Sequence, residues 1–505
     1  MKRRDWISVG LALASASVYS LFAVARGALS HALSGAAEGV EWAGFPLDDA
    51  WIHQVFARNL ATRGEFAFFP GQPSAGSTSP LWTFLLSLGY VVHLDFRAWT
   101  YLLGALFVGM SAVLLARLAR RIFNPSLSTF YFSLFILFEW HLAWSAVSGM
   151  EIPLFVFLSL FLFERFYARE RGWLLGLLAG LLTFTRPEGV VLAALVGVGK
   201  IIELRRHEDR EERAVDDLRV LGVFGGRYAL GFAVIIAPYL LFNLATSGTI
   251  LPNTFYAKSA EYAELFNQTP FIARWAQLLL VPFVGAQVLL LPGLIYLVAR
   301  QALQRQWLAL VPFVWLVLLP ALYAARLPVA YQHGRYEMPV VPFIALYGIW
   351  GTAVLLERIK SWAIRTTWAM STGALLVAFW FLGATSYATD VAIVDCEMVH
   401  TARWVAANAP ADAVVAAHDI GALGYFYGRP FIDLAGLASP DLIPFMRDEG
   451  RLRDYLFSRH ATFAVFFPDW YPALASDPRF VPAYQTGCMV TRQAGGTNMT
   501  VYQIK

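Results

Sequence analysis

The sequence has few charged residues. Asp, Glu, Lys and Arg make up 15% of its 505 residues and hydrophobic residues make up 58%, whereas soluble domains average about 25% charged and 45–50% apolar residues. This composition excludes an ordinary soluble protein and predicts many membrane-spanning segments. The net charge of +4 includes no long Lys/Arg tract with interleaved aromatics, so nucleic acid is not expected as a partner.

The motifs of several enzyme classes are also missing. The sequence contains no Ser-His-Asp order, nucleophile elbow, Cys/His zinc spacing, Walker loop or GxGxxG, so hydrolase and nucleotide-binding functions lack support. It shows no internal repeat and no low-complexity segment. The inverted repeats and mid-membrane charges of a secondary transporter are not evident either.

Cysteine is scarce. The two cysteines, Cys396 and Cys488, both lie in the C-terminal part. If that part is outside the cytoplasm, a disulfide between them would close a loop of about ninety residues and stabilise the fold by roughly 4–5 kcal/mol. Two unrelated buried thiols are the alternative, and the sequence leaves both open.

Long apolar runs are what the sequence does contain. The first starts at Trp6, after Met1-Lys-Arg-Arg-Asp. It is long for a signal peptide and no clean cleavage site ends it, so we interpret residues 6–28 as an uncleaved first helix with its basic end in the cytoplasm. Further segments that could span a membrane, or nearly so, lie at 79–94, 98–118, 127–146, 150–168, 172–184, 187–203, 228–246, 276–299, 306–325, 338–357 and 366–386.

Basic clusters between these segments carry the orientation signal. All of them lie on the side of the N-terminus if residues 79–118 cross only once, with 79–94 as a juxtamembrane or re-entrant helix. This topology predicts about eleven crossings and places the polar motifs described below together on the extracytoplasmic face. The clusters are Arg117/Arg120/Arg121, Arg165/Arg169/Arg171, Lys200 to Arg213, Arg300/Arg305 and Arg358/Lys360/Arg365.

The pattern changes near residue 388, where hydropathy falls. Short helical and strand patterns then alternate, with helices expected at 400–408, 421–428 and 451–459 and strands at 413–417, 430–434, 463–467 and 499–504. We therefore predict a polytopic α-helical membrane domain at 1–388, with a first outer loop at about 29–78. A C-terminal extracytoplasmic α/β domain follows at 389–505.

The stretch 42–82 holds two adjacent carboxylates, Asp48 and Asp49, at the edge of the membrane. A carboxylate there is costly unless it is hydrated or paired. One of the two could act as a general base on an attacking hydroxyl, while the other orients it or binds a cation. The alternative is an exposed loop or a helix N-cap, where Asp is common.

Five basic side chains are expected near the same interface and are candidates to bind a phosphate. Such cations would stabilise the charge that develops on a departing phosphate. A single one could also simply extend its charged end from the membrane into water, with no ligand. Carboxylates in S-G-M-E-I-P and T-R-P-E-G each open a helix, where the helix dipole alone would stabilise them. The cations are Arg58, Arg186, Lys258, His333 and Arg335, and the two carboxylates are Glu151 and Glu188.

These blocks resemble the GT-C superfamily of membrane glycosyltransferases, and most closely the cell-wall arabinofuranosyltransferases of actinobacteria and their bacterial relatives. The resemblance rests on L-D-D-A-W-I-H-Q-V-F-A-R-N-L-A, S-T-S-P-L-W, S-G-M-E-I-P-L-F, T-R-P-E-G, L-P-N-T-F-Y-A-K and G-R-Y-E-M-P-V-V-P-F, in the family's order. The segment H-D-I-G-A-L-G-Y-F-Y-G-R-P-F-I-D-L-A-G-L is similar to the end domain of related transferases. Trp51 and His53 depart from the family pattern, which leaves the sugar undefined.

The resemblance implies a polyprenyl-phosphate sugar donor, an inverting transfer without a nucleotide, and an acid of the first outer loop as base. It maps the acidic pair to Asp48 and Asp49 and the loop cation to Arg58, and it implies no required cofactor, although a divalent cation could bind Asp48, Asp49 and Glu151. The alternative is a flippase or other non-catalytic protein that binds the same lipid. Further residues expected to contact substrate are His53, Glu151, Glu188, Asn253, Tyr256, Tyr336, His418 and Asp419.

Overall fold

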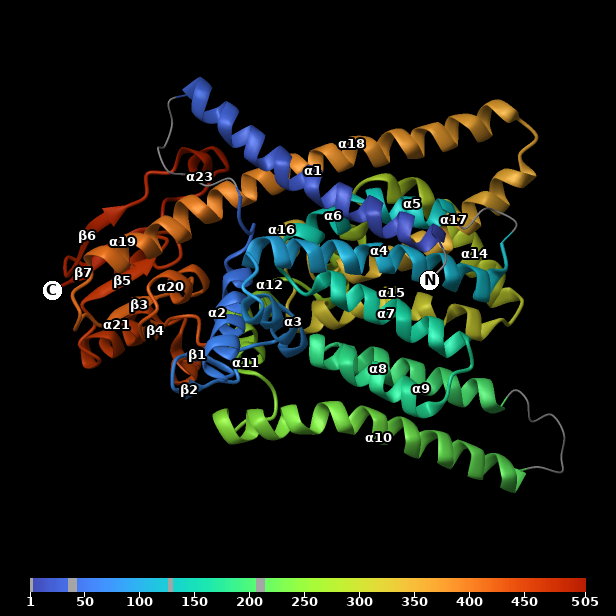
Figure 1. Cartoon of the computed structure of the whole chain (residues 1–505), viewed down its shortest axis with the longest axis horizontal. Coiled ribbons are helices and arrows are strands. Elements are labelled where there is room, and N and C mark those ends of the chain that lie inside the picture. The colour runs from blue at the N-terminus through green and yellow to red at the C-terminus, as the bar shows by residue number, and fades with distance from the viewer. Residues whose placement is uncertain (1–2, 35–42, 126–129, 206–213) are drawn as a thin grey trace.

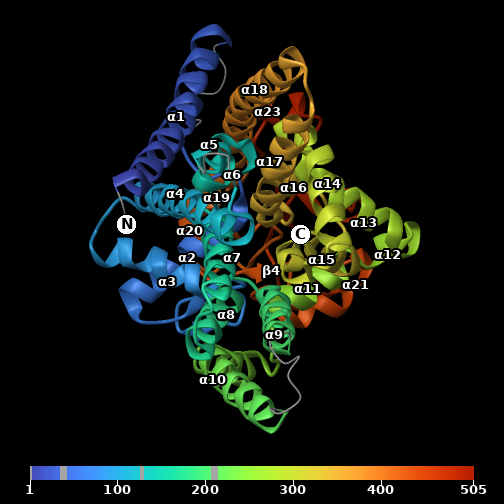
Figure 2. The ribbon, with the colours of Figure 1, turned by 90° about the vertical axis from the view of Figure 1, so that its right-hand side faces the viewer.

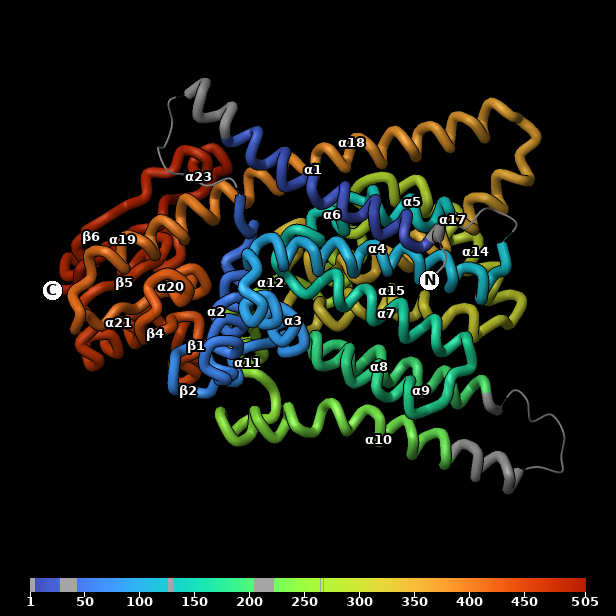
Figure 3. The backbone as a smooth tube through the Cα atoms, in the orientation of Figure 1, coloured from blue at the N-terminus to red at the C-terminus, as the bar shows by residue number. Residues whose placement is uncertain are grey.

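The computed structural model describes residues 3–34, 43–125, 130–205 and 214–505. Residues 35–42 of the expected first outer loop and residues 206–213 of the third basic cluster lie outside these ranges. The described chain forms an elongated bundle of helices, with the C-terminal sheet at one end and the N-terminus at the other (Figures 1 and 3). A layer of short elements between the bundle and the sheet contains the expected first outer loop.

The bundle is built from apolar helices of unequal length. Its N-terminal half comprises α1(Arg3–Ser34), α4(Phe96–Phe123), α5(Phe130–Phe138), α6(Trp140–Val147), α7(Ile152–Tyr167), α8(Gly172–Thr185), α9(Gly189–Arg205) and α10(Ala214–Ser247). Its C-terminal half comprises α13(Phe271–Leu280), η1(Val281–Phe283), η2(Ala286–Leu290), α14(Leu291–Leu303), η3(Trp307–Leu310), α15(Val311–Arg326), α16(Tyr331–Gly334), η4(Met338–Val340), α17(Val341–Arg358) and α18(Trp362–Val394). Helix α10 lies on the outside of the bundle against α8 (Figure 2). This contact requires glycine, because a Cβ on Gly176 would lie 2.1 Å from the carbonyl oxygen of Tyr228.

Seven helices in the described ranges are long and apolar enough to cross a membrane, and the bent pair α5–α6, with an angle of 59°, raises the number to eight. The chain is therefore a polytopic helical membrane protein. The number of described helices that are long enough to span is therefore lower than the eleven crossings expected from the sequence. Helices α7, α8 and α9 have 16, 14 and 17 residues, and 17 residues of helix cover only about 26 Å of a roughly 30 Å hydrocarbon layer. The expected non-spanning segment 79–94 forms the 12-residue helix α3(Pro80–Val91).

Ion pairs gather the basic ends of several helices at one end of the bundle. Arg117 near the end of α4 binds Asp5 near the start of α1, with 2.7 Å between Nη2 and Oδ2. Arg121 binds Glu164 of α7 at 2.7 Å. These contacts agree with the predicted placement of the first two basic clusters beside the N-terminus.

The first outer loop folds over the opposite end of the bundle. It contains α2(Asp48–Arg63) and a small hairpin of β1(Ala67–Phe69) and β2(Gln72–Pro73), and it leads into α3. Gly64 ends α2 in the left-handed region, with φ 72°, which glycine adopts without steric cost. A second excursion, α11(Asn253–Glu261) with α12(Ala263–Gln268), lies at the same end of the bundle (Figure 1).

The C-terminal domain is a mixed five-stranded sheet in the order β4-β3-β5-β7-β6. Strand β3 pairs in parallel with β4 and β5, and β7 pairs antiparallel with β5 and β6. All seven elements predicted from the sequence match observed ones, which are α19, β3, α20, β4, α21, β5 and β7. The elements are η5(Asp395–Val399), α19(His400–Asn408), β3(Val415–Ala417), α20(Gly421–Phe426), β4(Ile432–Asp433), η6(Pro440–Phe445), α21(Glu449–Ser458), β5(Phe463–Phe466), α22(Pro472–Ala475), β6(Phe480–Gln485), α23(Met489–Gln493) and β7(Thr500–Ile504).

No linker separates the two parts of the chain. Helix α18 runs through residue 388 and continues through the π-helical turn η5 into α19. A disulfide between Cys396 in η5 and Cys488 before α23 ties this helix to the sheet. The pairing that the sequence left open is therefore present.

Candidate active site

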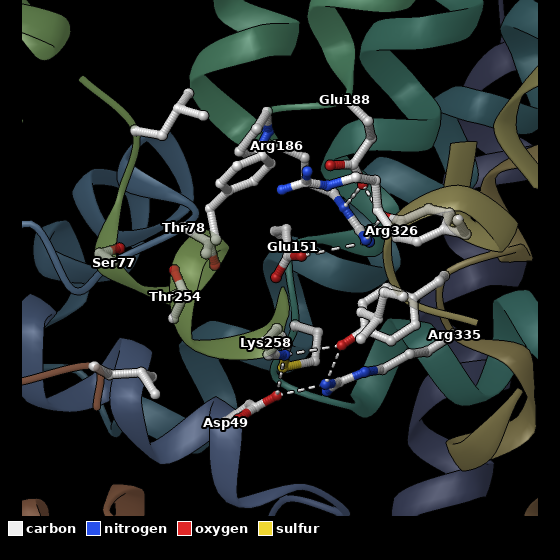
Figure 4. A pocket seen from close by; sticks show the side chains of 18 of the residues that line it. Asp49, Ser77, Thr78, Glu151, Arg186, Glu188, Thr254, Lys258, Arg326 and Arg335 are labelled. Atoms are coloured by element: carbon white, nitrogen blue, oxygen red, sulfur yellow. Dashed lines mark hydrogen bonds and ion pairs between the residues drawn. The ribbon is translucent and has the colours of Figure 1, made fainter. Parts of the chain in front are cut away.

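A cavity of about 310 Å³ opens where α2, the start of α7, the α8–α9 turn, α11, α15 and the segment before η4 meet (Figure 4). Eight of the residues proposed from the sequence line it. They are Asp49, His53, Glu151, Arg186, Glu188, Lys258, Arg335 and Tyr336.

Asp49 is the acid that faces two cations in this cavity. Its Oδ2 lies 2.5 Å from Nη2 of Arg335 and 3.9 Å from Nζ of Lys258. Both cations also donate to the hydroxyl of Tyr336, each at 2.8 Å. Burial alone would raise the pKa of Asp49, but the charges of Arg335 and Lys258 outweigh it and lower that pKa below its usual range. The carboxylate is thus ionised, and its side chain is still 35% exposed to the cavity.

A second charged group forms the far wall. Arg186 contacts two carboxylates, with 2.5 Å from Nε to Glu188 and 3.5 Å from Nη1 to Glu151. Its Nη2 also donates to the hydroxyl of Tyr323 at 2.6 Å. The other oxygen of Glu151 lies 3.2 Å from Nε2 of His53. Arg186 is therefore the shared counter-ion of Glu151 and Glu188, and the three side chains are at most 11% exposed.

Local backbone features aim these side chains into the cavity. Gly149 has φ 80° and a Cβ there would lie 2.7 Å from Phe45 and Ala50, so the turn before Glu151 needs glycine. Arg186 ends α8 in an extended conformation, which its position before Pro187 favours. On α11 the cavity is lined by residues one turn apart, Thr254, Phe255, Lys258 and Ser259.

One wall of the cavity is apolar. It is formed by Val190, Val191, Leu251, Leu322 and Leu327. A cavity lined by both cations and aliphatic side chains suits a ligand with a charged head and a hydrocarbon chain.

Asp48 does not line the cavity. Its two carboxylate oxygens accept hydrogen bonds from the backbone N–H groups of Gly421 (2.6 Å) and Ala422 (2.8 Å) in α20. Burial raises the pKa of Asp48 to about 6, although these two hydrogen bonds oppose the increase. The neighbouring acids therefore face different ways, and their pKa values are shifted in opposite directions.

Two of the five predicted phosphate ligands, Arg58 and His333, also lie outside the cavity. Arg58 donates to the carbonyls of Tyr425 and Gly424. His333 lies in a left-handed turn, and its Nε2 contacts Oδ2 of Asp390 at 2.7 Å.

Four of the predicted substrate ligands are outside the cavity as well. Asn253 donates to the carbonyl of Leu437, and Tyr256 is 37% exposed without lining the cavity. His418 pairs with the hydroxyl of Tyr471 at 2.7 Å, and its burial lowers its pKa to about 4. Asp419 follows it just beyond the end of β3, where burial and the charges of Asp48, Asp49 and Glu261 raise its pKa.

Several cavity residues were not identified from the sequence. The clearest is Arg326, which ends α15, is exposed, donates to Ser259 and lies 3.9 Å from the centre of the Phe255 ring. A single Arg directly after an apolar segment was the available signal, by the same reasoning that selected Arg186. Ser77, Thr78 and Tyr323 also line the cavity but carry no charge that would have marked them.

The three acids proposed as possible cation ligands do not converge. Asp48 binds α20, Asp49 binds Arg335, and Glu151 lies between His53 and Arg186. Among the described residues, no group of three or more His, Cys, Asp or Glu side chains is arranged to hold a metal ion.

The helical bundle, the outer-loop helix with its acidic pair and the C-terminal mixed sheet together form a membrane protein fold that is found in solved structures. Solved structures share it over nearly the whole chain. ArnT from Cupriavidus metallidurans in the apo state is 13% identical with a TM-score of 0.56, and the match covers 96% of this chain and 98% of ArnT. The same enzyme bound to undecaprenyl phosphate matches with a TM-score of 0.55 at 13% identity, over 99% of this chain and 98% of ArnT.

The oligosaccharyltransferase of Archaeoglobus fulgidus in complex with Zn and sulfate is 12% identical with a TM-score of 0.58, over 95% of this chain and 71% of the enzyme. Residues 397–502 match a family model described as a domain of unknown function (DUF8728). No curated protein matches the sequence.

Proposed function

We propose that this protein is a glycosyltransferase that moves a single sugar, an arabinofuranose or a hexose, from a polyprenyl monophosphate to a hydroxyl group. The acceptor is a glycan, lipid or protein outside the cytoplasm. The observation that carries the proposal is the arrangement of Asp49, Lys258 and Arg335 in a cavity with an apolar wall. The fold is similar to that of ArnT, which has been solved with undecaprenyl phosphate bound.

The donor phosphate would bind Arg335 and Lys258. Arg335 is almost fully buried, so its charge acts where little water screens it, and a guanidinium can hold two phosphate oxygens at once. The phosphate would compete with Asp49 for these cations. Donor binding would therefore free the Asp49 carboxylate and raise its pKa towards that of a useful base. The polyprenyl chain would lie along the apolar wall.

In the transfer step, Asp49 takes the proton of the acceptor hydroxyl. The acceptor oxygen forms a bond to the anomeric carbon from the face opposite the phosphate. The bond between that carbon and the phosphate oxygen breaks at the same time, and the electron pair leaves with the polyprenyl phosphate. Because the leaving group is already an anion, Arg335 and Lys258 stabilise it and no general acid is needed. The configuration at the anomeric carbon is inverted, and no role is assigned to a divalent cation.

The basic residues at the end of α4 support a membrane orientation. Arg117 and Arg121 bind Asp5 near the start of α1 and Glu164 near the end of α7, and positive residues favour the cytoplasm. The proposed active site would then face outward from the cell membrane.

The test is sugar transfer by the purified full-length protein in lipid nanodiscs. Radiolabelled polyprenyl-phosphate arabinofuranose, mannose and glucose serve as donors, and a membrane glycolipid extract serves as acceptor. We expect transfer from one donor, at least a 1,000-fold loss in Asp49→Asn, and undiminished binding of undecaprenyl phosphate by that variant. Asp454→Asn, at a 71% exposed side chain in the C-terminal domain, is the matched control. Wild-type rates in Asp49→Asn would exclude the mechanism, and donor binding without transfer would favour the carrier or flippase function.

A further inference from the structure

The C-terminal domain is attached to the acidic pair by a direct hydrogen-bonded contact. Asp48 is the first residue of α2, and both of its carboxylate oxygens are used by Gly421 and Ala422 of α20. A charged acceptor shared between two N–H donors at 2.6 and 2.8 Å forms strong, directional hydrogen bonds. These two residues are 373 and 374 positions apart from Asp48 in the sequence, so the contact joins two distant parts of the chain.

A second contact holds the other end of α20. Arg58, nearly three turns after Asp48 on α2, donates to the carbonyl oxygens of Tyr425 (2.8 Å) and Gly424 (3.4 Å). Its guanidinium also lies 4.4 Å from the centre of the Tyr425 ring. Between the two contacts, the Trp51 ring packs against Tyr425 with 5.0 Å between the ring centres. One face of α2 therefore holds α20 along its length.

The approach of the two helices is as close as glycine allows. A Cβ on Gly421 would lie 2.1 Å from the backbone oxygen of Asp48 and 2.9 Å from its carboxylate. No side chain fits at that distance, so any larger residue at position 421 must push α20 away from α2.

Asp48 and Asp49 are successive residues in the first turn of α2, about 100° apart around the helix axis. Leu47, the N-cap of α2, makes no side-chain capping bond, so the first turn lacks the usual local restraint. The restraint comes from the C-terminal domain instead. With Asp48 held on α20, the next side chain points about 100° away around the axis of α2, where Arg335 and Lys258 lie.

We infer that Asp48 is a positioning residue for Asp49, and that the C-terminal domain takes part in transfer by holding the start of α2 through Gly421 and Ala422. The inference rests on the proposed function. It assigns to Arg58 the same role at the other end of the contact, in place of phosphate binding. Asp48 touches neither donor nor acceptor, so its loss should affect turnover and leave donor affinity unchanged.

The experiment compares Asp48→Asn, Gly421→Ala and the double variant with wild type, all as full-length protein in nanodiscs. Transfer kinetics give kcat, titration with undecaprenyl phosphate gives its Kd, and hydrogen–deuterium exchange followed by mass spectrometry reports on the amides of 420–424. We expect each single variant to lower kcat at least tenfold, to change Kd less than twofold and to speed exchange in 420–424. Because both changes break one contact, the double variant should be no slower than the slower single variant. Asp454→Asn is again the control.

Three outcomes overturn the inference while leaving the proposed function intact. They are a wild-type kcat in Asp48→Asn, unchanged exchange in 420–424, and multiplicative losses in the double variant. A drop in kcat that only follows a lower fraction of folded protein would show a structural role and also overturn it. If the wild-type protein transfers no sugar, the proposed function itself fails, and faster exchange in Asp48→Asn would then report the contact alone.

Discussion

Arg335 and Asp49 are 286 positions apart in the sequence, yet Nη2 of Arg335 lies 2.5 Å from Oδ2 of Asp49. The same guanidinium nitrogen lies 2.8 Å from the hydroxyl of Tyr336. This pair joins the first outer loop to the segment that precedes α17, and the cavity forms around it. A cation held by an internal carboxylate is poised to exchange that partner for a phosphate.

Arg335→Lys should weaken donor binding although it keeps the positive charge. Lysine presents a single ammonium group and cannot hold two phosphate oxygens with a planar fork while it also donates to Tyr336. We expect about a tenfold increase in the Kd for undecaprenyl phosphate, measured by titration in nanodiscs. Arg358→Lys, at the exposed far end of α17, should bind as wild type. Equal affinity in the two variants would argue against a bidentate phosphate contact.

Arg186→Gln should destabilise the fold more than it affects the chemistry. The substitution leaves Glu151 and Glu188 as buried carboxylates without their cation, and removing one partner of a buried ion pair costs about 3–5 kcal/mol. We expect a clear decrease in Tm. Thermal unfolding is monitored by light scattering or intrinsic fluorescence. Adding Glu188→Gln should restore part of the loss, because one uncompensated charge is then gone.

The control for Arg186→Gln is Arg326→Gln. This arginine lines the same cavity but is exposed and contacts a neutral serine. Its removal should leave Tm unchanged. Similar decreases in Tm for both variants would show that the buried ion pairs around Arg186 are not what stabilises this wall.

Acidification should weaken the C-terminal domain through His418. The unfolded chain binds a proton at His418 below pH 6.5, whereas in the folded protein burial lowers its pKa to about 4. The unfolded state therefore holds more protons between these values, and stability falls as the pH decreases from 6.5 to 4, by about 3 kcal/mol in full. We expect the Tm of His418→Gln to fall less than that of wild type over this range. Parallel Tm curves would contradict the assignment.

Reduction of the disulfide should loosen the sheet. Cys396 and Cys488 are separated by 92 positions, and opening a loop of that size costs about 4–5 kcal/mol in the chain-entropy model. We expect a lower Tm after treatment with dithiothreitol, and the same decrease without reductant in Cys396→Ser/Cys488→Ser. Labelling with maleimide before and after reduction verifies the bond. Labelling of both cysteines without reductant would show that it does not form.

The sequence predicted which residues gather at the cavity better than it predicted which way they point. Counting crossings between basic clusters brought Asp49, Arg186, Lys258 and Arg335 to one side, because helix parity depends only on the order of the apolar segments and basic clusters along the chain. The choice between Asp48 and Asp49 depends on where α20 docks, and residue order along α2 contains no information about that contact. Similarly, α11 turns Lys258 into the cavity and Tyr256 out of it, a difference set by helix rotation.

Local backbone chemistry explains two further differences. Strand β6 was missed because Pro482 interrupts its pattern, and β6 is indeed an edge strand, where proline is tolerated. His333 was expected beside Arg335, but Gln332, His333 and Gly334 all have positive φ values. That turn sends the imidazole to Asp390 on α18.

The uninterrupted helix from Trp362 to Asn408 has a mechanical consequence. Its 47 residues extend for about 70 Å, more than twice the roughly 30 Å thickness of the hydrocarbon layer. The half that protrudes from the membrane is joined to the C-terminal domain by the Cys396–Cys488 disulfide. Any change in the tilt of this helix inside a thinner or thicker bilayer therefore moves the sheet, and with it α20, which begins at Gly421, relative to the membrane surface.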